Sequence, residues 1–221
     1  MSSDCEQIQY AAHTGEIAVD TKKKTRYATE RDTEEVQRQR RVYQEKISAL
    51  DAKDLIFLDE TGVNIAMARP YARAPKGQRV HVSAPVNKGK NVTVLGALSL
   101  EGIVEAMTID GSADGQVVST FIQDVLIPAL RPGQTVIMDN LSSHKVNGIQ
   151  DAIEAMGARL EYLPSYSPDL SPIEKCWSKL KAIVRAKAAR TRAYLDQAIT
   201  EALDMITAQD ARGWFAHCGY V

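Results

Sequence analysis

The distribution of apolar residues divides the chain near residue 50. Before that point the sequence is polar and rich in Lys, Arg, Glu and Gln. A helix is predicted there only over residues 33–50, with little apolar face before Val42. After it, short apolar runs alternate with turn signals. We therefore predict a polar, basic arm or linker over residues 1–50 and one main domain over residues 51–221.

The apolar runs after residue 54 have the length of buried strands. They are LIFLDETG (55–62), NVTVLGALSLEG (91–102), VEAMTIDG (104–111), TVIMDN (135–140) and ARLEYLP (158–164). The first three follow one another closely, which favours an antiparallel meander. Helical patterns over residues 116–130 and 146–156 separate the later runs, which favours parallel crossovers. The predicted fold is therefore α/β, with a mixed five-stranded sheet flanked by helices.

Two further helices are predicted over residues 171–189 and 191–206. In the first, the apolar residues recur at spacings of three and four and form one face: Ile173, Trp177, Leu180 and Val184. The charged residues from position 175 to position 192 are all basic. Such a run is either a solvated helix face or a surface for a polyanion, and its single sign favours the polyanion. The candidate contacts are Lys175, Lys179, Lys181 and Arg185.

Composition narrows the class of protein. The 221 residues are 44% hydrophobic and 25% charged, with a net charge of −1, which is typical of a globular chain and not of one that coats nucleic acid over its whole surface. Three widely spaced cysteines indicate neither a disulfide framework nor a cysteine zinc site. The longest apolar run is too short for a membrane helix, and the first residues lack a signal-peptide pattern. We expect a cytoplasmic protein without a membrane partner.

Three acidic residues lie where a strand ends or a helix begins. Asp59 ends LIFLD, Asp139 ends TVIMD, and Glu174 opens the basic helix. Acids at the ends of strands in an α/β sheet project into the crevice where such sheets bind ligands. Neighbouring carboxylates repel each other unless a cation neutralises them, and oxygen ligands favour Mg²⁺ or Mn²⁺ over zinc. The pattern predicts a metal site suited to phosphate chemistry.

Each of these acids also has an ordinary structural explanation. An Asp at a strand end is a common turn residue. The residues from Ser171 to Glu174, with Pro172 between them, have the form of a capping box. In that case the Glu174 carboxylate would bond to the Ser171 N–H instead of facing a metal. The two roles compete for one side chain, so their geometry distinguishes them.

The remaining acids and one histidine are weaker candidates. Strand alternation turns Glu60 to the opposite face from its neighbour, whereas Asp110 competes as another acid at a strand end. Asp114 and Asp169 lie in turn-like sequences, where local hydrogen bonds are expected. His144 is a poor ligand for a hard cation, and it either contacts a phosphate or a carboxylate or is structural.

Taken together, LIFLDETG, VIMDNLSSH and LPSYSPDLSPIEKCWSKLK resemble the catalytic signature of DDE transposases of the mariner-like superfamily, most closely its bacterial insertion-sequence 630 family. The three motifs occur in the family's order, and the interval between the second and third is typical of it. By this resemblance Asp59, Asp139 and Glu174 match the catalytic, metal-binding triad. Asn140 and His144 match the polar residues that commonly follow the second Asp.

The resemblance implies an RNase H-like fold and a Mg²⁺- or Mn²⁺-dependent enzyme, with two ions. It implies cleavage of DNA at the ends of a mobile element and strand transfer into target DNA. The partners would be double-stranded DNA, both terminal inverted repeats and target, and a second copy of the chain in a homodimer. The basic residues after Glu174 would contact this DNA.

The sequence departs from the family in two respects. Ser171 stands where many relatives have Asn, a change that keeps the chemistry of a helix cap. Full-length relatives also carry an N-terminal helix-turn-helix region that reads the inverted repeats, and no counterpart is evident here. We therefore expect a catalytic-domain product that is either accompanied by a separately encoded helix-turn-helix portion or left by a truncation or frameshift. Two alternatives stay open: another RNase H-like nuclease, and a truncated, noncatalytic DNA-binding remnant that regulates a full-length transposase.

Overall fold

The computed structural model describes residues 27–140 and 148–221. Its centre is a five-stranded sheet with the strand order β3-β2-β1-β4-β5. The strands are β1 (Leu55–Val63), β2 (Val92–Ser99), β3 (Gly102–Asp110), β4 (Thr135–Met138) and β5 (Arg159–Tyr162). The first three pair antiparallel, and β4 and β5 join them in parallel. The predicted mixed sheet is therefore confirmed, including the direction of every strand pair.

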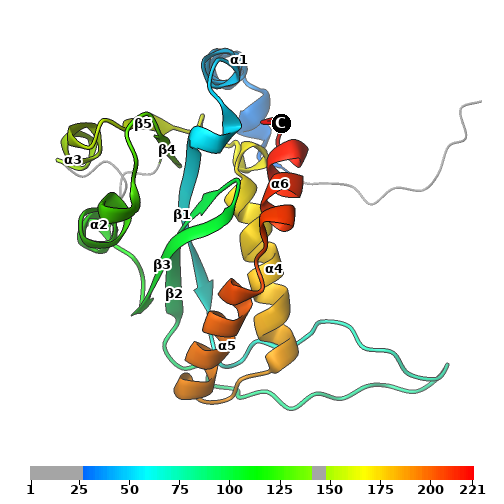
Figure 1. The fold of residues 1–221 in the computed structure, drawn as a ribbon. Coiled ribbons are helices and arrows are strands. Elements are labelled where there is room, and N and C mark those ends of the chain that lie inside the picture. The colour runs from blue at the N-terminus through cyan, green and yellow to red at the C-terminus, as the bar shows by residue number, and fades with distance from the viewer. Residues whose placement is uncertain (1–26, 141–147) are drawn as a thin grey trace, which may run out of the picture.

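Helices cover both faces of this sheet (Figure 1). They are α1 (Glu34–Ser48), α2 (Gly115–Thr120), α3 (Ile149–Ala155), α4 (Pro172–Lys187), α5 (Arg192–Asp204) and α6 (Ala208–His217). Three of them lie within a few residues of the predicted helices over 33–50, 171–189 and 191–206. The run predicted over 116–130 continues from α2 through a π-helical stretch to a 3₁₀ turn that ends at Ala129. None of the helices in the described ranges is both long and apolar enough to cross a membrane.

Two segments differ from the predicted helices. The start of the helix predicted over residues 146–156 lies outside the described residues, and α3 covers its remainder. The closing helix α6 was not predicted. It is short and buries only Ala211 and Phe215, so its apolar pattern spans too few residues to indicate a helix.

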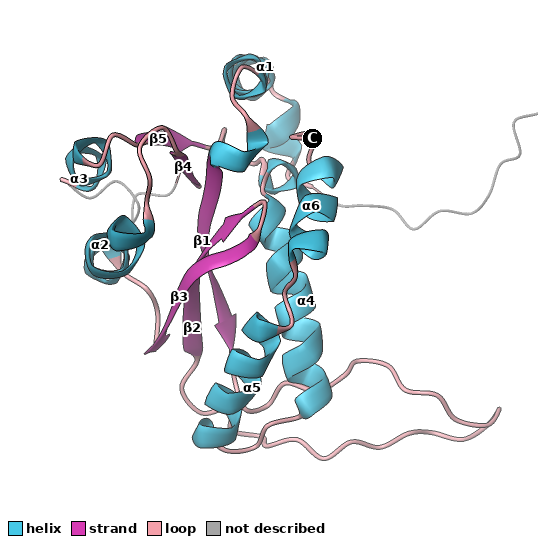
Figure 2. Ribbon diagram, in the orientation of Figure 1, coloured by secondary structure: helices cyan, strands magenta, loops and turns pink. Residues whose placement is uncertain are grey.

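Side-chain alternation along β1 divides the core into two clusters. Leu55 and Phe57 pack with α4, α5 and α6 on one face, whereas Ile56 and Leu58 pack with α2 and α3 on the other. Figure 2 shows these two groups of helices on opposite sides of the strands. The same alternation continues to Asp59, which therefore shares the face of Phe57 and looks toward α4.

The helix of the N-terminal arm, α1, contributes to the core next to the C-terminus. Its buried residues recur at spacings of four and three: Val36, Arg40, Tyr43 and Ile47. The hydroxyl oxygens of Tyr43 and Tyr220 lie 3.0 Å apart, which joins α1 to the end of the chain. Val42, where the apolar face was expected to begin, is 57% exposed. The division of the chain at residue 50 stays a prediction.

A long loop of residues 64–91, without helix or strand, connects β1 to β2 and extends beyond the helical layer (Figure 2). Arg190, just after α4, holds the base of this loop. Its guanidinium donates to the carbonyl oxygens of Ile65, Met67 and Ser83 at 2.8, 2.9 and 3.0 Å. The loop is therefore anchored just beyond the C-terminal end of the helix that carries Glu174.

Candidate active site

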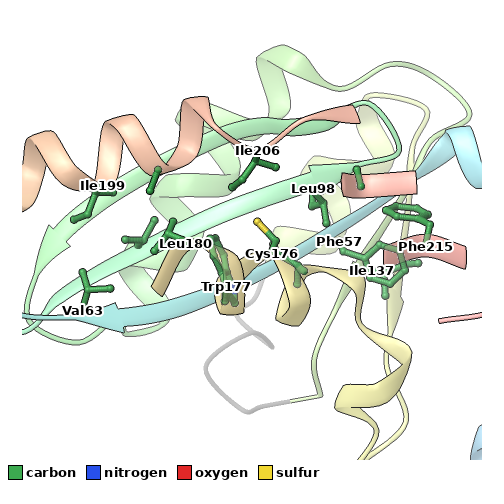
Figure 3. Packing of buried hydrophobic residues seen from close by; sticks show 14 of the residues in the cluster. Phe57, Val63, Leu98, Ile137, Cys176, Trp177, Leu180, Ile199, Ile206 and Phe215 are labelled. Carbon is green, nitrogen blue, oxygen red and sulfur yellow. The ribbon is translucent and has the colours of Figure 1, made fainter. Parts of the chain in front are cut away.

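The first two carboxylates of the predicted triad come from neighbouring parallel strands. In the register of β1 and β4, Phe57 lies opposite Ile137, and both pack on the α4 face of the sheet (Figure 3). Asp59 and Asp139 each come two residues later in the chain. Asp59 lies in the middle of β1, so the strand end predicted there is wrong, whereas Asp139 directly follows β4 as predicted. Because side chains alternate, both carboxylates lie on that same face, just beyond the residues over which β1 pairs with β4.

The third carboxylate comes from the first turn of α4. Pro172 occupies the first helical position, with Ser171 as the cap residue, so the predicted helix start is confirmed. The capping box that was the alternative role for Glu174 is not formed, because the Ser171 side chain makes no capping hydrogen bond and the Ser171 backbone N–H donates to the carbonyl of Pro168 at 3.1 Å. The Glu174 side chain is thereby not needed by its own helix cap.

Asp59, Asp139 and Glu174 line one cavity of about 140 Å³. The rest of its wall consists of Leu58, Leu163, Pro164, Ser167, Pro168 and Ser171. Within the described ranges, no three side chains of the ligating types are gathered tightly enough to enclose an ion as they stand. The three carboxylates thus face a common space without converging on one point, and Glu174 is exposed enough to rotate into it.

The electrostatics of this cavity favour a cation. Burial, and next the charge of Glu174, raise the pKa of Asp59 to about 7. Glu60 and Asp139 add smaller repulsions. A divalent cation would remove this repulsion, and an all-carboxylate donor set fits Mg²⁺ or Mn²⁺ better than a softer metal. The residues present therefore suit such an ion.

One hydrogen bond to a carboxylate of the cavity was not predicted from the sequence. Trp177 lies one helical turn after Glu174, and its indole N–H donates to Oδ2 of Asp59 at 3.0 Å. The sequence predicted only that Trp177 lies on the apolar face of the helix, which is confirmed because the residue is 2% exposed. The spacing of three residues from Glu174 was the available signal for its second role.

Competing acids lie elsewhere. Asp110, at the end of β3, accepts a hydrogen bond from Nε of Arg192 at 2.9 Å and does not line the cavity. Glu60 does not line it either, as strand alternation predicts. Asp114 caps α2 by accepting from the Val117 N–H at 2.9 Å, which confirms its local role.

Asp169 makes the predicted local hydrogen bond, to its own backbone, and it also has distant partners that its turn-like sequence did not indicate. Its carboxylate accepts two hydrogen bonds from the buried Arg40 of α1, at 2.8 and 3.1 Å, and one from Arg31 at 3.1 Å. Although burial alone would raise the pKa of Asp169, the hydrogen bonds and charges of Arg40 and Arg31 lower it. Asp169 therefore ties the N-terminal helix to the segment that leads into Glu174.

Of the two polar residues predicted to act after the second Asp, the structure describes only the first. Asn140 is exposed and lines a groove of about 310 Å³ beside the cavity, together with Arg38 and Lys46 of α1. Leu163 and Pro164 line both the groove and the cavity, so the two are neighbours. His144 lies outside the described residues.

The basic residues of α4 differ in their surroundings. Lys175 is exposed, and Lys181 and Arg185 are half-buried. Lys179 instead bonds to the Asp210 carboxylate and, at 2.8 Å, to the carbonyl of Met205. Its charge is compensated within the protein, so the uniform basic stripe predicted from the sequence is interrupted there.

A second group of basic residues was missed by the sequence analysis. It lies on the long loop, which carries six basic residues and no acidic one: Arg69, Arg73, Lys76, Arg79, Lys88 and Lys90. Arg69 and Arg73 line a cavity with Arg185 of α4. Arg69 and Arg73 are far from Arg185 in the sequence, and only the fold brings these three together.

Residues 54–196 match the family model described as DDE superfamily endonuclease, and the chain belongs to this family. The match covers the strands and the helix that supply Asp59, Asp139 and Glu174. It confirms the identification made from the three motifs at the level of this superfamily. A search of curated proteins found no match.

Solved structures of a mariner transposase share the fold. A Mos1 transposase paired-end complex with the left transposon end has a TM-score of 0.73 at 14% identity, covering 90% of this chain and 63% of that chain. The catalytic domain of Mos1 transposase has a TM-score of 0.62 at 13% identity, covering 87% and 91%. A Mos1 paired-end complex with Mg has a TM-score of 0.64 at 17% identity, covering 90% and 65%. The sheet and its flanking helices thus form the RNase H-like fold of transposase catalytic domains.

Proposed function

We propose that this chain is the catalytic domain of a cut-and-paste DNA transposase of the insertion-sequence 630 family. It would cleave DNA strands at the ends of a mobile element and transfer them into target DNA. One observation carries the proposal: Asp59, Asp139 and Glu174, from two parallel strands and a helix, line one cavity in a chain of the DDE superfamily.

In this proposal the three carboxylates hold two Mg²⁺ or Mn²⁺ ions. Such ions polarise a phosphoryl oxygen and make a bound water a stronger nucleophile. The two aspartates, fixed by the sheet, set the position of the scissile phosphate, and Glu174 closes the site from the first turn of α4. Water would attack a backbone phosphorus and break its bond to the 3′ oxygen, which leaves a 5′ phosphate and a 3′ hydroxyl. That hydroxyl would then attack a phosphorus of target DNA and displace the 3′ oxygen bonded to it. One site serves both displacements because only the nucleophile changes.

The solved relatives support DNA and a divalent metal as ligands. Structures of Mos1 transposase include a complex with a transposon end and paired-end complexes with Mn and with Mg. Here we propose that Lys175, Lys181 and Arg185 of α4 contact DNA phosphates, with Asn140 and His144 acting beside the second Asp. The basic loop would extend this surface, since phosphate contacts supply much of the affinity of DNA-binding proteins.

The proposal assigns Lys179 to the protein's own structure. Lys179→Ala should lower the free energy of unfolding by about 1 kcal/mol, or the melting temperature by about 2–4 °C, since it removes the partner of Asp210 at the start of α6. Its effect on affinity for duplex DNA should be smaller than that of Lys181→Ala, the matched control. Thermal unfolding and fluorescence anisotropy measure the two quantities. A larger loss of DNA affinity for Lys179→Ala than for Lys181→Ala would return Lys179 to the DNA surface.

Recognition of particular DNA ends is proposed to come from a helix-turn-helix portion outside these 221 residues, and a second copy of the chain would pair the two ends. The chain spans 63% of the length of the Mos1 chain in the paired-end complex. We further propose that residues 1–50 are the linker to that portion, with α1 packed against the catalytic domain.

The proposal is tested by strand cleavage of a duplex that ends in the inverted repeat next to the gene, with the helix-turn-helix portion added. Cleavage is expected with Mg²⁺ or Mn²⁺ and not with EDTA, as measured on denaturing gels. Binding without cleavage under these conditions would support the noncatalytic regulator. A preference for RNA–DNA hybrids would support another RNase H-like nuclease.

A further inference from the structure

The Trp177 side chain joins the first carboxylate of the cavity to the core of the domain. The residue is 2% exposed, and its N–H donates to Oδ2 of Asp59 at 3.0 Å. An indole offers one donor and no acceptor, and a buried donor without a partner is costly. The hydrogen bond therefore fixes both the ring and the carboxylate that accepts from it.

The six-membered ring of the indole lies against Gly96 on β2. Gly96 is paired with Asp59 in the register of β1 and β2. A Cβ atom at Gly96 would lie 2.7 Å from Cη2 and 3.4 Å from Cζ2 of Trp177, so the ring occupies the space of a side chain there. The backbone of Gly96 does not require glycine, because its φ lies outside the left-handed region. Space for the ring is the reason for glycine at this position.

We propose that Trp177 is a positioning residue that orients the Asp59 carboxylate for metal binding, with Gly96 setting the depth of the indole ring. This inference rests on the proposed function of Asp59 as a metal ligand. The indole N–H holds Oδ2, the backbone N–H of Glu60 also bonds to this carboxylate, and Asp59 lines the cavity. Partners behind a metal ligand commonly fix its orientation in this way.

Through this arrangement α4 determines the positions of two carboxylates, those of Glu174 and Asp59. Glu174 projects from the first turn, and Trp177 reaches Asp59 from the next turn on the same helix. Figure 3 shows Trp177 beside Cys176 and Leu180, which pack α4 against the sheet. A shift of the helix would therefore move Glu174 and the orientation of Asp59 together.

The test measures Mn²⁺ binding to the intact chain by calorimetry, a readout independent of cleavage. Trp177→Phe keeps an aromatic ring but lacks the N–H, and it should weaken Mn²⁺ binding by roughly 10- to 100-fold. Trp214→Phe removes the other tryptophan of the chain, which lies outside the cavity, and should leave binding unchanged. Circular dichroism verifies that each variant is folded. Binding by Trp177→Phe within twofold of the wild type would overturn the inference.

Gly96→Ala provides a second variant, which retains the N–H but displaces the ring. It should weaken Mn²⁺ binding in the wild type and have little further effect in Trp177→Phe, because phenylalanine lacks the atoms that a Cβ would meet. Additive effects of the two substitutions would also overturn the inference.

Asp139→Asn separates this inference from the proposed function. If Asp139→Asn abolishes Mn²⁺ binding and Trp177→Phe does not weaken it, the metal site is supported and the positioning role of Trp177 is wrong. If the wild-type chain binds no Mn²⁺, both the proposed function and the positioning role of Trp177 are wrong.

Discussion

Replacing Asp139 by Asn, or Glu174 by Gln, should reduce metal-dependent strand cleavage by at least about 1,000-fold. Each substitution removes one negative oxygen ligand and keeps the volume of the side chain. The measurement is the rate of cleavage at saturating Mg²⁺, with the helix-turn-helix portion present.

The same substitutions should not unfold the protein. Glu174 is exposed, and its charge contributes to the raised pKa of Asp59, so it repels that carboxylate when no cation is bound. Glu174→Gln should therefore leave the melting temperature in EDTA unchanged or slightly raised. This combination of lost activity and retained stability is expected of a ligand and not of a core residue.

Asp110→Asn is the matched control, because Asp110 is also an acid at a strand end but lies outside the cavity. It should cleave at a rate close to that of the wild type. Equal losses of activity in Asp110→Asn and Asp139→Asn, or normal cleavage by Asp139→Asn, would contradict the assignment of the triad.

Two features were predictable from local patterns: the sheet, and the meeting of Asp59, Asp139 and Glu174 at one cavity. The order of helices and strands favours parallel pairing of the later strands, and parallel neighbours bring acids beyond their paired residues to one edge. Ser171 and Pro172 likewise mark a helix start that is visible within four residues. The direction of the Glu174 side chain was left open by the pattern, because a capping box and a metal ligand share one sequence.

Contacts between distant segments were not predictable in this way. Asp169 has the sequence context of a turn residue, yet its partner Arg40 lies 129 residues away. Trp177 was identified as apolar, and the N–H that bonds to Asp59 adds nothing to the periodicity of a helix. Both contacts depend on how α1 and α4 pack against the sheet, which no short window of sequence contains.

The contact of Asp169 with Arg40 leads to the second prediction. Asp169→Ala should lower the free energy of unfolding by about 2 kcal/mol and the melting temperature by about 4–8 °C. Arg40 is 7% exposed and would be left buried without this partner. The expected loss is below that of a fully buried pair because the Asp169 side chain is 41% exposed and partly screened by solvent. Arg31→Ala removes the outer hydrogen bond to Asp169 and a contact with the Tyr27 ring, and it should cost about 0.5 kcal/mol.

The pH dependence of this loss separates charge from packing. Because Arg40 and Arg31 hold the pKa of Asp169 below its ordinary value of 3.8, the stabilisation is fully present above that value. It is lost as the pH falls through the lower pKa of the folded state. Chemical denaturation of the wild type and Asp169→Asn should therefore differ most near neutral pH and converge once the pH lies below the lowered pKa of the folded state. A difference that stays constant down to that pH would show that Asp169 acts through packing and not through its charge.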